Sequence, residues 1–209
     1  MDLFIKELKE KIHSIDGTIF VAISGHGAAG KTSFSKKICE ELSLPYNYLN
    51  TDSYIIEGQH LHNTFASYEV DGQESQYKIT ACMPIRHELS SLARDLEVLR
   101  NGEDLITIDK PWDPQKVLKG KRKVTIVEGM SVAFLEPFNF DLSVYMYTDS
   151  ATELKRREIR DTNERGRDLN ALISAQEHRR NQYDLFMHPL KDKFHNIIDF
   201  SDDIFKIIK

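Results

Sequence analysis

The chain has 209 residues, of which 40% are hydrophobic, and only two cysteines. This length is sufficient for one sizeable hydrophobic core and requires no second domain, and two cysteines are too few for a disulfide scaffold. The formal net charge is −5, so the chain lacks the overall basic field that nucleic-acid binding usually needs. We therefore predict no nucleic-acid partner.

The first fifteen residues, MDLFIKELKEKIHSI, alternate charged and apolar residues and predict a short amphipathic helix packed on the domain. They lack the uninterrupted apolar core of a signal peptide. No later stretch approaches the ~18 apolar residues that a transmembrane helix requires. We therefore expect a cytoplasmic protein with no membrane partner.

Residues 19–37, IFVAISGHGAAGKTSFSKK, fit the phosphate-binding template G-x-x-x-x-G-K-[ST]. The apolar run before the glycines has the length of a buried parallel strand, and the residues after Lys31 have apolar side chains at helical spacing. A strand, a glycine-rich loop and a helix in this order are the context in which the motif binds phosphate. The sequence therefore predicts a nucleotide-binding loop at this position.

In such a loop, backbone N–H groups and the N-terminus of the following helix form a cradle for phosphates. In that geometry Lys31 reaches the β- and γ-phosphates and the Thr32 hydroxyl is a Mg²⁺ ligand. We assign nine consecutive residues to the cradle: Gly25, His26, Gly27, Ala28, Ala29, Gly30, Lys31, Thr32 and Ser33.

Two acidic residues follow predicted strands. Residues 44–50 predict a strand that leads directly to Asp52, and the apolar run 124–127 ends in Glu128. In an open parallel sheet, ligands bind beyond the carboxyl ends of the strands. By position alone, Asp52 has two interpretations: a functional carboxylate, which acts as general base or in the Mg²⁺ shell, or an ordinary turn residue. Glu128 lies where a carboxylate that holds Mg²⁺ is expected.

The intervening region is less regular. Residues 55–82 show no sustained hydrophobic period and predict a functional loop or flap near the acceptor site. A helix is predicted to begin at Pro84 and to end at Asn101-Gly102. Further strands are predicted at 105–108, 142–147 and 197–198, with a last helical turn at 204–208. This alternation of strands and helices predicts an α/β fold with a mainly parallel sheet wrapped by helices.

A helix after Asp149 carries five arginines within twelve residues. They are either a charged helix face or part of a lid, and Gly166 favours the lid because a glycine there breaks the helix. A flexible segment that bears arginines suits a lid that closes over phosphates and stabilises charge during transfer. The five are Arg156, Arg157, Arg160, Arg165 and Arg167.

Together these motifs resemble the uridine kinase-like branch of the P-loop kinases, which includes phosphoribulokinase and bacterial pantothenate kinase. The most specific match is RREIRDTNERGRD, residues 156–168, which is similar to the uridine kinase lid nearly residue for residue. Residues 21–38, TDSY at 51–54, VTIVEG at 124–129 and MHPLKDKFHNIID at 187–199 also match. The similarity spans most of the chain.

The resemblance implies a three-layer P-loop NTPase fold, with residues 1–209 as a single kinase domain, a lid at about 160–169 and an acceptor-side flap at about 55–82. It implies that ATP and Mg²⁺ are the cofactors, that Asp52 deprotonates the acceptor hydroxyl near the metal, and that Thr32 and Glu128 help to hold Mg²⁺. Lys31 would hold phosphates, and the lid arginines Arg160, Arg165 and Arg167 would close on the transferring group.

The acceptor side departs from the family. Uridine kinases carry an H-P-D-A-F-D run before the long helix, and here that stretch reads Cys82 to His87. The basic loop 110–123 is shorter than the corresponding loop of uridine kinases and lacks the Tyr and His that read the pyrimidine there. Trp112 in this loop either stacks on a substrate ring or is a loop aromatic without contact to the substrate. Arg86 and His87 either face an acidic acceptor or are solvated.

The sequence thus predicts a kinase for the hydroxyl of a nucleoside-like small molecule. The alternatives are a non-nucleoside alcohol, such as a pantothenate-like or sugar-phosphate acceptor, and a non-catalytic regulatory protein that binds ATP. The chain has no [NT]-K-x-D guanine-reading motif and no L-S-G-G-Q motif, which argues against a GTPase and an ABC-type ATPase. The oligomeric state stays open, and a homo-oligomer is allowed.

Overall fold

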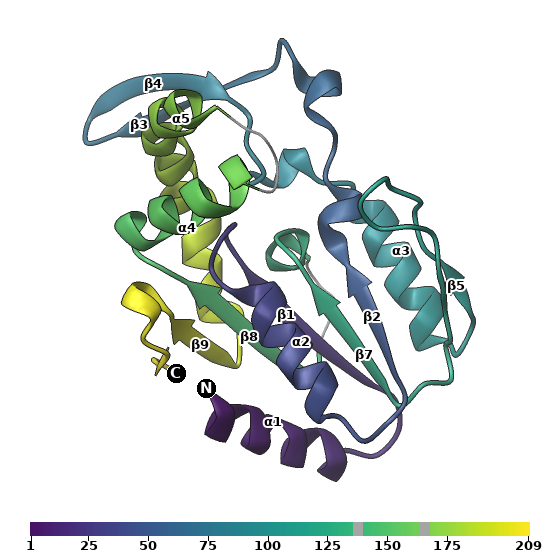
Figure 1. Ribbon diagram of the computed structural model, residues 1–209. Coiled ribbons are helices and arrows are strands. Elements are labelled where there is room, and N and C mark those ends of the chain that lie inside the picture. Colours follow the sequence, from purple (N-terminus) through teal and green to yellow (C-terminus); the bar gives the residue numbers. More distant parts are fainter. Residues whose placement is uncertain (136–139, 164–167) are drawn as a thin grey trace.

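A computed structural model describes residues 1–135, 140–163 and 168–209 (Figure 1). Within them a central six-stranded sheet has the order β10-β9-β8-β1-β7-β2, in which all neighbours pair in parallel except β10 with β9. Its strands are β1 (Ile19–Gly25), β2 (Tyr46–Asn50), β7 (Val124–Glu128), β8 (Leu142–Tyr147), β9 (Asn196–Asp199) and β10 (Lys206–Ile207).

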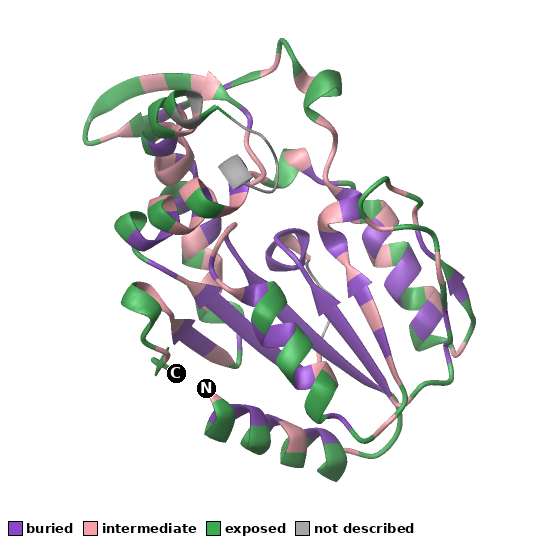
Figure 2. Cartoon of the chain, viewed as in Figure 1, coloured by how far each residue is buried: buried purple, intermediate pink, exposed green. Residues whose placement is uncertain are grey.

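The neighbouring interior strands β1 and β7 are buried along their whole length (Figure 2). Successive side chains of β1 point to opposite faces of the sheet. Val21 and Ile23 pack in the core with Leu8 and Phe34, on the face covered by the first two helices. Phe20 and Ala22 pack in the other core. A strand buried on both faces explains why its sequence is continuously apolar.

Helices cover both faces and produce the three layers that the sequence predicted. The helices are α1 (Asp2–Ser14), α2 (Lys31–Glu41), α3 (Leu89–Arg100), α4 (Ser150–Asn163) and α5 (Leu169–Gln182). The amphipathic N-terminal helix is confirmed as α1. None of the helices in the described ranges is long and apolar enough to span a membrane.

The predicted flap contains a hairpin, although its sequence shows no sustained hydrophobic period. Strand β3 (Phe65–Val70) pairs antiparallel with β4 (Gln73–Lys78) around Asp71 and Gly72. Both turn residues have positive φ, 51° and 78°, as the two central residues of a type I′ turn require. The dipeptide Asp-Gly was the signal that identifies this hairpin. The structure therefore replaces the irregular part of segment 55–82 with a two-stranded flap.

The flap is held against α5. The Tyr77 ring stacks on His178 with centroids 4.1 Å apart. The Gln182 amide oxygen accepts hydrogen bonds from the Thr80 N–H at 3.0 Å and hydroxyl at 2.7 Å, and its amide nitrogen donates to the Lys78 carbonyl at 2.9 Å. The flap is therefore attached to the helix that follows the predicted lid.

The predicted helix that ends at Asn101 is confirmed as α3, but its predicted start was wrong, and so was the last helical turn. Residues Pro84–Arg86 form a separate 3₁₀ turn and α3 begins only at Leu89, because the intervening His87 is extended and pairs with Ile55. The predicted helical turn at 204–208 is instead part of an antiparallel pair between β10 and β9. Strand β5 (Leu105–Ile106) pairs with β6 (Val117–Leu118) in a small separate hairpin.

Candidate active site

The glycine-rich loop joins β1 to α2, as the sequence predicted. Gly25 has a φ of 138°, and a Cβ at this position would lie 1.8 Å from the Met146 carbonyl oxygen. Gly30, with a φ of 92°, caps the N-terminus of α2. Only glycine meets these backbone conformations and approaches without strain. The loop thereby directs the N-terminus of α2, which favours anions, toward the open cleft.

Lys31 is buried and folded back over the loop. Its ammonium group donates a hydrogen bond of 2.9 Å to the His26 carbonyl and lies 4.0 Å from Glu128 Oε1. The cation is therefore fixed between the loop and the end of β7. Its predicted role, which is to neutralise phosphates held in the loop, stays a prediction.

Glu128 ends β7 and is only 3% exposed. Its Oε2 accepts hydrogen bonds from the Tyr48 hydroxyl at 2.7 Å and from the Thr32 hydroxyl at 3.2 Å. Burial raises the pKa of this carboxyl, against the opposing effects of Lys31 and of the two hydroxyl donors. A desolvated carboxylate in this environment gains from a further cation.

Asp52 lies close to Glu128 because β2 and β7 are parallel neighbours. Asn50 is the register partner of Glu128, and the chain then forms the 3₁₀ turn Thr51–Tyr54. The Asn50 side chain accepts the backbone N–H of Asp52 at 2.9 Å and so fixes the start of this turn. Asp52, Glu128, Lys31 and Thr32 all line the same cleft.

The oxygen atoms gathered here suit a hard divalent cation. Thr32 contributes a hydroxyl, and Asp52 and Glu128 contribute carboxylates, which are ligands that Mg²⁺ prefers, with its remaining positions filled by water or phosphate. Among the described residues, no group of three or more His, Cys, Asp or Glu side chains could hold a metal by itself. The described side chains that line this part of the cleft thus offer such a cation two carboxylates and one hydroxyl.

The cleft has a volume of about 1120 Å³ and extends from the phosphate loop to the flap. Trp112 is 59% exposed and does not belong to the lining, so it is a loop aromatic. On the flap side the lining includes Ile55, Gly58, Tyr77 and Ile79. Within the part of the chain that the structure describes, five arginines line the cleft: Arg86, Arg156, Arg157, Arg160 and Arg179.

The predicted lid is only partly described. Arg160, on α4, lines the cleft, and its Nε donates to Asp161 Oδ1 at 2.7 Å. Arg165 and Arg167 lie outside the described residues, so their roles stay predictions. Arg179, on α5, was missed by the sequence analysis, because nothing in the local pattern of α5 distinguishes it from the neighbouring charged residues.

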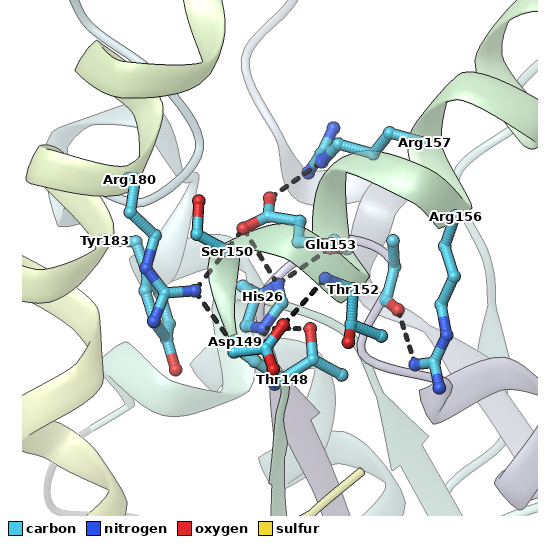
Figure 3. A network of polar contacts seen from close by, with 12 residues as sticks. His26, Thr148, Asp149, Ser150, Thr152, Glu153, Arg156, Arg157, Arg180 and Tyr183 are labelled. Carbon is cyan, nitrogen blue, oxygen red and sulfur yellow. Dashed lines mark hydrogen bonds and ion pairs between the residues drawn. The ribbon is translucent and has the colours of Figure 1, made fainter. Parts of the chain in front are cut away.

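Beneath the loop lies a buried polar network that the sequence analysis also missed (Figure 3). The His26 side chain, assigned to the phosphate cradle, instead points into it. Its Nε2 accepts the Thr148 N–H at 2.9 Å, so its Nδ1 carries the proton and donates to the Gly27 carbonyl at 2.8 Å. Burial lowers the pKa of His26 to about 4, and the imidazole is therefore neutral at physiological pH.

Arg157 connects this network to the loop. Its Nε donates to Glu153 Oε1 at 2.7 Å, and its Nη1 lies 3.6 Å from Asp161 Oδ2. A Cβ at Gly27 would lie 2.4 Å from its Nη2. The spacing Glu-x-x-x-Arg-x-x-x-Asp on one helix was the available sequence signal. Burial lowers the pKa of Arg157 to about 10, so it remains a cation at neutral pH beside the phosphate loop.

Arg86 and His87 have different environments, although they are adjacent. His87 is buried, with Nε2 donating to the Ala81 carbonyl at 2.9 Å and Nδ1 lying 2.8 Å from the Ser131 hydroxyl. The His87 side chain neither faces the cleft nor is solvated, so both interpretations offered for it from the sequence were wrong. Arg86 lines the cleft.

The fold and the site define a P-loop protein of the kinase type, in which a phosphate loop and an acidic cluster share one cleft. The Phosphoribulokinase / Uridine kinase family model matches residues 20–203, and the chain belongs to this family. As a member it is an ATP-dependent kinase that transfers phosphate to a small molecule.

Individual relatives support the same assignment. A uridine kinase of Macrococcus caseolyticus is 28% identical over 189 residues, which cover 85% of this chain and 82% of the relative. A uridine kinase of Listeria welshimeri is 29% identical over 188 residues, with coverages of 84% and 80%.

Solved structures share the fold at lower identity. Phosphoribulokinase from Rhodobacter spheroides has a TM-score of 0.62 at 13% identity and covers 87% of this chain and 70% of its own. D-glycerate 3-kinase from Cryptococcus neoformans has a TM-score of 0.62 at 11% identity, with coverages of 99% and 98%. The central sheet and its flanking helices are therefore those of the P-loop kinases.

Proposed function

We propose that this protein transfers the γ-phosphoryl group of ATP to a hydroxyl group of a nucleoside-like small molecule. The observation that carries the proposal is the meeting of Lys31, Thr32, Asp52 and Glu128 in one cleft that continues to the flap. Curated relatives of similar length are uridine kinases, which supports a nucleoside-like acceptor. We also propose that residues 1–209 act as a single kinase domain with a lid at about 160–169.

Each residue has a specific task in this reaction. Phosphoryl transfer depends mainly on positioning and on neutralising charge. Asp52 orients the acceptor hydroxyl and accepts its proton. Lys31 and the loop amides hold the phosphates, and Arg160, with Arg165 and Arg167 from the lid, neutralises charge on the transferring group. Lid closure excludes water from the cleft.

Thr32, Asp52 and Glu128 would hold Mg²⁺, which when bound neutralises charge on the ATP phosphates. Glu128 is prepared for this task because Tyr48 and Thr32 donate to its Oε2. These hydrogen bonds fix the carboxylate and favour its ionised form, in opposition to the effect of burial.

The test is an ADP-release assay with ATP and Mg²⁺ across nucleosides, vitamins and sugar phosphates, repeated with GTP as donor. We expect a nucleoside-like acceptor to be phosphorylated. Asp52→Asn should lower turnover at least ~100-fold, in the range that removal of a general base costs, while ATP binding is retained. Near-normal turnover of Asp52→Asn would contradict its role as base.

A second variant tests the donor side separately. Lys31→Ala should abolish the increase in melting temperature that ATP and Mg²⁺ produce, because the ammonium group that faces the phosphates is lost. An unchanged increase would refute the phosphate role of Lys31. ATP binding without phosphorylation of any acceptor would instead favour a regulatory protein.

A further inference from the structure

Arg86 is a cation that the described protein does not neutralise. Its Nη1 donates to the Ile79 carbonyl at 3.1 Å, and its Nη2 lies beside Gly58, where a Cβ would be 3.5 Å away. Its Nε is buried and has no acceptor. Among the described residues no carboxylate forms an ion pair with the guanidinium, although the side chain is half-buried in the cleft.

The arginines of α4 are different in this respect. Arg156 pairs with Asp203, Arg157 pairs with Glu153, and Arg160 pairs with Asp161. Charged groups that leave water are normally paired, because an uncompensated charge in a partly desolvated place is unfavourable. Desolvation accordingly lowers the pKa of Arg86. Arg179 of α5 also has a buried Nε without an acceptor, but its charge acts on the nearby Glu153 carboxylate and lowers the pKa of that group. The uncompensated charge of Arg86 indicates that a negative group from outside the chain completes the flap side of the cleft.

Arg86 is tied to the segment that carries the predicted base. Ile55 pairs with His87 in an antiparallel bridge, and the Ile56 N–H donates to the Arg86 carbonyl at 2.9 Å. The turn Thr51–Tyr54, with Asp52, directly precedes this bridge. A ligand bound to Arg86 is therefore held at a fixed place relative to Asp52, which lines the same cleft.

The ATP phosphates have cations of their own. Lys31 lies in the loop, and Arg157 approaches it closely enough for a Cβ at Gly27 to collide with the guanidinium. Arg86 instead lies among the flap-side residues Gly58 and Ile79. Its free hydrogen-bonding capacity is thus on the acceptor side of the cleft.

We propose that the acceptor carries an anionic group, a carboxylate or a phosphate, in addition to the hydroxyl that is phosphorylated, and that Arg86 binds this group. The proposal rests on the proposed kinase function of the same cleft and specifies its substrate class. Arginine suits the task because its planar fork can form two parallel hydrogen bonds to a carboxylate or phosphate.

Binding is measured by calorimetry on the full chain saturated with Mg²⁺ and a non-hydrolysable ATP analogue, so that the phosphate loop is occupied. The probes are matched pairs that share hydroxyls and differ in one negative group: uridine with orotidine, ribose with ribose 5-phosphate, and glycerol with glycerate. In at least one pair the anionic probe should bind about 10- to 100-fold more tightly, as expected for a hydrogen bond to a charged group.

Three variants locate the preference. Arg86→Gln should remove it without changing the affinity for the ATP analogue, whereas Arg86→Lys should keep part of it because the charge is retained. Lys78→Gln is the matched control, since it removes one exposed cation from the lining of the same cleft. Thermal melting checks that each variant is folded.

The proposal is wrong if no anionic probe binds more tightly than its neutral partner, or if Lys78→Gln loses the preference as fully as Arg86→Gln. A second outcome also contradicts it: uridine is phosphorylated rapidly, no anionic probe is phosphorylated faster, and Arg86→Gln does not change these rates. In that case the proposed kinase function stands. If anionic probes bind through Arg86 but none supports ADP release, the binding site stands and the proposed phosphorylation of a nucleoside-like acceptor fails.

Discussion

Replacing Tyr48 with Phe tests whether the Glu128 carboxylate is held by its hydrogen bonds. The Tyr48 hydroxyl donates to Glu128 Oε2 at 2.7 Å. A hydrogen bond to a charged group contributes about 1.5–3 kcal/mol, and the half-buried position of Tyr48 favours the lower end. A loss of about 1.5 kcal/mol lowers the melting temperature of a domain of this size by roughly 3–6 °C.

The same change affects catalysis through the pKa of Glu128. Burial raises this pKa and the Tyr48 hydrogen bond lowers it, so Tyr48→Phe should raise it further. Because the ionised carboxylate is the form that holds a metal, the acid limb of the pH profile of kcat/KM should move to higher pH, and more Mg²⁺ should be needed for half-maximal rate.

Tyr46→Phe is the matched control on the same strand. The Tyr46 hydroxyl forms its side-chain hydrogen bond with the Cys39 thiol. Melting curves and pH profiles of the two variants are compared with those of the wild type. If Tyr48→Phe leaves both the melting temperature and the acid limb unchanged, the hydrogen bond does not support Glu128 and our account of the metal site is wrong.

Two further predictions concern the phosphate loop and its surroundings. Gly27→Ala should lower the free energy of unfolding by about 1–3 kcal/mol, as overpacking does, because the new Cβ would displace the Arg157 guanidinium. Urea unfolding measures this free energy, and a value equal to that of the wild type would contradict the packing described for Gly27. Burial lowers the pKa of both His26 and His87 from 6.5 to about 4, so each is neutral in the folded state while its unfolded form gains a proton below pH 6.5. Stability should be fully present above pH 6.5 and should fall toward pH 4 by about 1 kcal/mol per pH unit for each histidine; His87→Gln should make this slope shallower, and a slope equal to that of wild type would refute the assignment.

The donor side of the site was predictable because its signals are local. The loop motif lies between an apolar strand and an apolar-faced helix, and these patterns place Lys31 and Thr32 at the start of that helix, where phosphates are predicted to bind. Glu128 was found because it ends a buried strand. The parallel pairing of β2 with β7 then places Asp52 near Glu128, as the rule for the carboxyl ends of strands anticipates.

The acceptor side was less predictable because it depends on contacts between distant segments. Arg86 and His87 were equivalent in sequence, and the antiparallel bridge between Ile55 and His87 is what separates them. That bridge buries one side chain and leaves the other in the cleft lining. The flap hairpin had a local signal in Asp71-Gly72, but its attachment to α5 through Gln182 had none.

The burial of His26 was also not predictable, because it depends on a contact with a distant segment. In the loop motif its position is unspecified, and only the end of β8 supplies the Thr148 N–H that turns the imidazole inward. The roles of Arg165 and Arg167 stay predictions from the resemblance, since both lie outside the described residues.

The ATP side and the acceptor side of the cleft are therefore positioned by different elements of the fold. The positions of Lys31, Thr32 and Glu128 depend on the buried strands β1 and β7, which are neighbours in the interior of the sheet. Arg86 depends on the Ile79 carbonyl and on the space beside Gly58, both of which belong to the flap segment. Changes in the flap should consequently alter which acceptor binds and leave ATP binding intact. Loss of ATP binding in flap variants would instead show that the two sides are coupled. Helix α5 would be the connecting element, because α5 contacts the flap through Gln182 and the polar network beneath the phosphate loop through Arg180.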